Sequence, residues 1–131
     1  MTDIPLVAID LDDDERRFMV EALNEYFGAA KRAVPFLSSS LGASSDDEFR
    51  ALVWRLLEAI DNGQPLSELD WSRALFLAEI SWASDLVGSG LDFATRFRDE
   101  DAVELVRSVQ RKTVTPRRYN LLRDNAKIVA N

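Results

Sequence analysis

The sequence of 131 residues contains neither cysteine nor histidine. Without cysteine it can form no disulfide, thiolate metal site, iron–sulfur cluster or thiol nucleophile. Without histidine it lacks the usual zinc ligand, the base of a Ser-His-Asp triad and a general base that titrates near neutral pH. We therefore expect a protein that is not an enzyme and has no cofactor and no metal. Carboxylate chemistry, a lysine amine or an oxygen-ligated metal such as magnesium remain the alternatives.

Long apolar runs are absent as well. No stretch reaches about 18 apolar residues, and no basic segment precedes the short apolar run near the N-terminus. The sequence thus predicts a protein that neither spans a membrane nor is secreted, and cytoplasmic localisation is the simplest interpretation. The composition, 47% hydrophobic and 30% charged, is close to the globular average, so we expect one domain over residues 1–131.

Charge is divided unevenly along the chain. Residues 1–106 carry 9 basic and 22 acidic side chains, a formal charge of −13, whereas residues 107–131 carry 7 and 1, a formal charge of +6. The acidic body indicates a partner with a basic surface. The basic residues of the C-terminal segment are Arg107, Arg111, Lys112, Arg117, Arg118, Arg123 and Lys127. We expect this segment to pack on the body; left free, it could contact phosphates.

Apolar residues recur every three or four positions along most of the chain, which is the period of an amphipathic helix. Helices are predicted over residues 12–27, 46–61 and 67–87, with a fourth beginning at Asp99 and a fifth at Thr115-Pro116. The third helix is apolar around most of its circumference, which is typical of a helix at the centre of a domain. The sequence therefore predicts an all-α fold, a single bundle of about five helices.

Three segments fall outside this helical pattern. Residues 29–45, with a proline and a run of three serines, predict a long loop containing a short helical turn. Residues 4–11 could be extended, and residues 92–98 predict a short turn before the fourth helix.

The densest acidic run spans residues 10–15. It matches the acidic positions of a calcium-binding loop, but Glu15 occupies the position where the sharp turn requires glycine. Residues 7–12 resemble the opening of haloacid-dehalogenase phosphatases and of response-regulator receivers. Both families need a parallel sheet, whereas the sequence after Leu11 predicts one helix after another. We therefore interpret the run as the solvated start of a helix, where the helix dipole favours negative charge.

Two polar residues, Glu79 and Ser72, fall within the apolar arc of the predicted helix over residues 67–87. A carboxylate in that arc is either a tuned acid or ligand-orienting group, or the partner of a cation from a neighbouring helix. We favour the second interpretation, a buried ion pair of Glu79 with an arginine of a neighbouring helix, for example Arg107 or Arg111.

Trp54 interrupts a charged face of the predicted helix over residues 46–61, where its neighbours include Asp47, Glu58 and Asp61. Tryptophan is enriched at binding hot spots, so these four residues are predicted to bind a partner, unless the segment 29–45 covers the indole. The sequence as a whole favours a small acidic module that binds a basic protein, as an inhibitor, immunity or adaptor protein. The alternatives are a nucleic-acid-binding or regulatory protein that uses the basic C-terminal helix, and a carboxylate- or metal-dependent enzyme.

Overall fold

The structure, a computed structural model, describes residues 4–28, 30–83 and 99–130. The described part of the chain is mostly helical, which confirms the predicted fold class, and it adds a two-stranded sheet. The helices are α1 (Asp13–Asn24), α2 (Val34–Leu37), α3 (Asp46–Asp61), α4 (Glu68–Ala83), α6 (Asp99–Thr113) and α7 (Pro116–Ala130). The strands are β1 (Leu6–Val7) and β2 (Leu66–Ser67), and short 3₁₀ turns are η1 (Glu25–Phe27), η2 (Lys31–Ala33) and η3 (Ser39–Leu41).

Side-chain caps fix where the helices begin. Asp12 and Glu15 form a capping box, in which each side chain accepts a hydrogen bond from the backbone N–H of the other. The hydroxyl of Ser45 caps α3, and that of Thr115 caps α7 ahead of Pro116, as predicted from the Thr-Pro pair. These local signals explain why the helix starts could be predicted from the sequence.

The region between the first two long helices is more ordered than predicted. Instead of a loop with one helical turn, residues 31–41 form η2, α2 and η3 in succession. Gly42 ends this run with a φ of 78°, a left-handed conformation that a residue without a Cβ adopts without strain. The predicted end of the third helix beyond residue 83 and the predicted turn at residues 92–98 lie outside the described residues.

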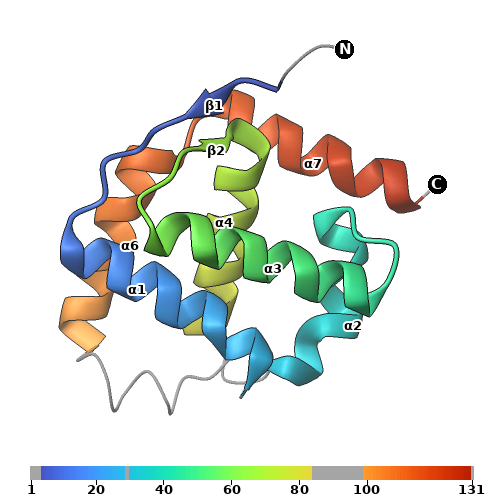
Figure 1. Cartoon of the computed structure of the whole chain (residues 1–131), viewed down its shortest axis with the longest axis horizontal. Coiled ribbons are helices and arrows are strands. Elements are labelled where there is room, and N and C mark those ends of the chain that lie inside the picture. The colour runs from blue at the N-terminus through green and yellow to red at the C-terminus, as the bar shows by residue number, and fades with distance from the viewer. Residues whose placement is uncertain (1–3, 29, 84–98, 131) are drawn as a thin grey trace.

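Helix α4 occupies the centre of the bundle, as its apolar circumference predicted, and packs against α1, α3, α6 and α7 (Figure 1). Because neighbours surround it, even Asp70 and Ser81 are buried. Asp70 is paired with Arg55 at 2.6 Å and with Arg73 at 2.8 Å. Burial by itself would raise the pKa of Asp70, but hydrogen bonds from the two guanidinium groups outweigh it, and the pKa lies below its ordinary value.

The small sheet ties the N-terminal segment to the start of α4. Strands β1 and β2 are antiparallel, with Leu6 opposite Ser67 and Val7 opposite Leu66. The indole N–H of Trp71 donates to the carbonyl of Val7 at 2.8 Å, so the strand is also held by the core of the bundle. The segment that the sequence left as extended is therefore part of the fold.

Candidate functional site

The exposed side of α3 carries a pair of aromatic rings. Trp54 and Phe27 meet edge to face, with ring centroids 5.8 Å apart and an interplanar angle of 86°. Trp54 is 49% exposed and Phe27 40% exposed. The segment 29–45 thus leaves half of the indole open, and the ring in contact with it comes from η1. Phe27 was missed from the sequence because it continues the apolar stripe of the first predicted helix, which indicated burial.

Acidic side chains surround this pair. Asp47, Glu58 and Asp61 are exposed, and their spacing of seven, four and seven residues from Trp54 puts them on the same side of α3. Asp47 lies 3.4 Å from Arg50, whereas Glu58 and Asp61 form no ion pair within the described ranges. We call Phe27, Asp47, Trp54, Glu58 and Asp61 the Trp54 face. The four predicted partner-binding residues therefore share one surface, and their role in binding stays a prediction.

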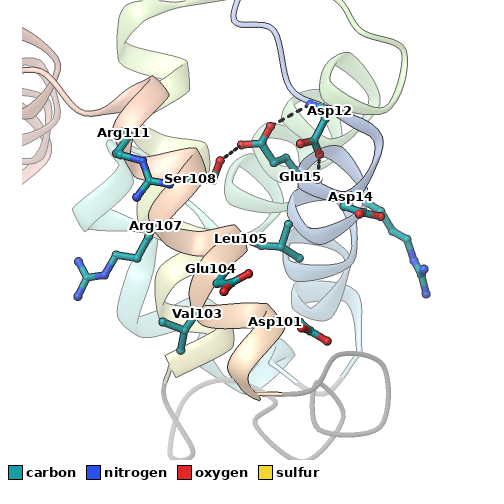
Figure 2. A pocket seen from close by; sticks show the side chains of 11 residues that line it. Asp12, Asp14, Glu15, Asp101, Val103, Glu104, Leu105, Arg107, Ser108 and Arg111 are labelled. Atoms are coloured by element: carbon teal, nitrogen blue, oxygen red, sulfur yellow. Dashed lines mark hydrogen bonds between the residues drawn. The ribbon is translucent and has the colours of Figure 1, made fainter.

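A pocket of about 780 Å³ lies between α1 and α6 (Figure 2). Its charged lining residues are of both signs: Asp12, Asp14, Glu15, Arg17, Asp101, Glu104, Arg107 and Arg111. Such a wall favours no single ligand charge, because acidic and basic side chains line the same pocket. The acidic run of residues 10–15 therefore shares its surroundings with arginine side chains.

Glu15 is fully buried beside this pocket, which corrects the interpretation of the whole acidic run as solvated. Its carboxylate accepts hydrogen bonds from Ser108 at 2.6 Å and from the backbone N–H of Asp12 (Figure 2). Lys112 donates a third hydrogen bond, at 2.5 Å. Burial alone would raise its pKa, but the hydrogen bonds from Lys112, Ser108 and Asp12 outweigh it, and the pKa lies below its ordinary value. The ionised, fully engaged carboxylate clamps α1 to α6 and is poorly suited to accept a proton.

Glu79 and Ser72 differ from each other in burial. Ser72 is buried, whereas Glu79 is half-buried and accepts a hydrogen bond from the amide of Gln110 at 2.7 Å. The predicted ion pair with Arg107 or Arg111 is wrong. The cause is the rotation of α6, since these arginines are four residues apart and both face the pocket of Figure 2, while Gln110 turns toward α4.

The basic C-terminal segment packs on the body. Lys112 reaches Glu15, and Arg117 binds Glu68 at the start of α4. Hydrogen bonding to Glu15 raises the pKa of Lys112, so this amine is firmly protonated. The remaining arginines mostly have local partners: Arg107 donates to Gln110, Arg118 lies near Glu68 and donates to the Thr113 carbonyl, and Arg123 contacts Asp124 and the ring of Tyr119. Arg111 lines the pocket, and the side chain of Lys127 lies outside the described residues.

The described residues show no further feature that would define a class of protein. Within residues 4–28, 30–83 and 99–130, no three acidic side chains are grouped so as to hold a metal ion. Among the helices of the same ranges, none has the length and apolar character needed to cross a membrane. No protein-family model, curated protein or solved structure matches this chain. The fold and its exposed side chains alone therefore support the proposal below.

Proposed function

We propose that this protein binds a basic protein partner through the Trp54 face, as an inhibitor, immunity or adaptor protein. The observation that carries the proposal is the exposed edge-to-face pair of Trp54 and Phe27. Removal of exposed aromatic rings from water favours their burial in an interface, and tryptophan is among the residues enriched at hot spots. Such a pair offers a partner a ready anchor.

The Trp54 face is held on a rigid support. The opposite side of α3 is buried in the core through Phe49, Val53, Leu56 and Ile60. Phe49 also packs edge to face against Tyr26, which anchors the junction of α1 and η1, where Phe27 emerges. A surface built on such elements loses little conformational entropy when it binds.

The acids of the Trp54 face favour a basic partner. Glu58 and Asp61 form no ion pair within the described part of the chain, so their charges are available to an approaching cation. Complementary charge mainly speeds association and excludes acidic partners, while the aromatic anchor supplies binding energy. The engagement of Lys112 and Arg117 by acids of the body argues against the alternative of nucleic-acid binding.

The test is capture of a partner on immobilised protein, followed by measurement of its binding rates. The variants Trp54→Ala and Glu58→Lys are compared with the matched controls Tyr119→Ala and Glu104→Lys, which change an exposed aromatic and an exposed acid elsewhere. Trp54→Ala is expected to weaken binding about 30-fold or more, the effect of a hot spot. Glu58→Lys should mainly slow association. The controls should bind like the unmodified protein.

Two results would contradict the proposal. The first is a specific partner whose affinity is unchanged by Trp54→Ala. The second is a partner with an acidic surface, or a nucleic acid, as the species retained in a Trp54-dependent manner.

A further inference from the structure

A smaller pocket, of about 290 Å³, lies where α4 meets the corner between α6 and α7. Leu75 and Phe76 of α4 and Leu122 of α7 give it apolar walls, and the exposed ring of Tyr119 stands at its margin. This volume lies just below the range of roughly 300–1,000 Å³ for ligand pockets. The pocket is therefore suited to a small molecule with an apolar body.

Glu79 supplies the negative charge of this pocket. It is seven residues from Ser72 and three from Phe76, so all three lie on the side of α4 that lines the pocket. The neutral amide of Gln110 donates a hydrogen bond to its carboxylate, and the described residues include no cation paired with it. A half-buried carboxylate with apolar neighbours and a neutral partner attracts a cation.

Arg118 and the hydroxyl of Thr113 also line the pocket, together with Ser72 and Thr115. Arg118 donates to the backbone carbonyl of Thr113 at 2.8 Å, and its Nε lies 3.8 Å from Glu68, which does not line this pocket. Glu68 thus lies near its charge, while the buried Nε of Arg118 makes no hydrogen bond with the described residues. Thr113 is 1% exposed, and its hydroxyl forms no hydrogen bond. Buried hydroxyls normally have a partner, so this one is available to a polar group that enters.

We propose that this pocket binds a small organic amine, a protonated ammonium group carried on an apolar or aromatic body. The ammonium group pairs with Glu79, and the body packs against Leu75, Phe76 and Leu122. The aromatic rings of Phe76 and Tyr119 add a favourable environment for a cation. This site is separate from the Trp54 face, and it stands or falls independently of the proposed function.

The test titrates three probes that share a phenethyl group into ¹⁵N-labelled full-length protein at neutral pH: phenethylamine, neutral 3-phenylpropanamide and anionic 3-phenylpropionate. Phenethylamine should shift backbone amide signals of residues 72–79 and 113–122. It should bind at least tenfold more tightly than the other two probes, because a hydrogen bond between charged groups is stronger than a neutral one.

The variant Glu79→Gln keeps the shape of the side chain and removes its charge, and Glu104→Gln is the matched control on α6. Glu79→Gln should weaken phenethylamine binding about tenfold or more, while Glu104→Gln leaves it unchanged. If Glu79→Gln fails to fold, the positions of the amide signals that phenethylamine shifts in the unmodified protein decide whether the pocket binds it. Absence of binding, shifts outside these residues, equal affinity for the Gln variant, or preference for 3-phenylpropionate would each overturn the proposal.

Discussion

Glu15 connects α1 to α6. Three donors from two helices meet on a carboxylate that has no exposed surface, although its neighbours Asp12 to Asp14 are all exposed. The same carboxylate completes the capping box of α1. A single side chain therefore stabilises both the start of a helix and its packing.

Glu15→Ala is expected to lower the free energy of unfolding by about 2–3 kcal/mol, because it removes half of the capping box and leaves Ser108 and Lys112 without their acceptor. The value is at the low end for a buried pair because Lys112 can turn to water. Asp14 is exposed in the same turn, so Asp14→Ala should change the free energy of unfolding by less than about 0.5 kcal/mol. Urea unfolding measures both. A loss below about 1 kcal/mol for Glu15→Ala would mean that the clamp contributes little.

Single residues also mark the limit of what could be predicted from the sequence. The sequence identified Trp54 as off-pattern, and it is exposed. It gave no sign that Glu15 is buried, because its partner on α6 is 97 residues away, although the Asp-x-x-Glu spacing of a capping box was visible. For Glu79 it located the correct neighbouring helix but the wrong side chain, since helix rotation depends on the packing of the whole bundle.

At the level of elements, the long helices were predictable because periodicity and caps are local properties. The short turns η2, α2 and η3 were not, because no segment of three or four residues has a period to read. The place of η3 is fixed by contact with a distant helix instead: η3 packs against α7, and the side chain of Asn125 donates to the carbonyl of Leu41 at 3.1 Å.

Gly42 tests the contact between η3 and α7. A Cβ at this position would lie 1.7 Å from Nδ2 of Asn125, and the backbone is left-handed. Gly42→Ala is therefore expected to destabilise the protein by about 2 kcal/mol or more, through strain and the displacement of Asn125. In the same variant, hydrogen exchange of the backbone amides of residues 116–125 should be faster than in the unmodified protein.

Gly63→Ala is the matched control for Gly42→Ala. Gly63 is also left-handed, with a φ of 67°, but the nearest atom to an added Cβ is 3.8 Å away. Only the conformational strain remains, which costs about 1 kcal/mol. Equal losses in the two variants, with unchanged exchange in α7, would show that Asn125 moves aside freely and does not hold α7 in place.

At the scale of the whole molecule, the charge pattern separates the two leading functions. The segment of residues 107–131 has a formal charge of +6, but Lys112 and Arg117 are bound to acids of the body, and a body of −13 repels a polyanion. A free basic C-terminal segment and one that packs on the body therefore predict different salt dependences of the affinity for nucleic acid.

Labelled duplex DNA and single-stranded RNA should bind no more tightly than the nonspecific level of about 10⁻⁴–10⁻⁶ M at physiological salt. A free arm with five to seven phosphate contacts would instead give a slope of log affinity against log salt of about −4.5 to −6 on duplex DNA. Titration at two salt concentrations measures this slope. Submicromolar binding with the steep slope, lost in the triple variant Arg117→Ala, Arg118→Ala and Arg123→Ala, would favour nucleic-acid binding over the Trp54 face.

The contacts of Glu15 can form only in a fixed order while the protein is being synthesised. A ribosome produces the N-terminal part first, and the capping box needs only residues three apart, so α1 can form early. The donors Ser108 and Lys112 are translated 93 and 97 residues later. During that interval the carboxylate of Glu15 lacks these two donors, although α3 and α4, which also pack against α1, have already been synthesised. The contact between α1 and α6 therefore forms only after α6 has been synthesised.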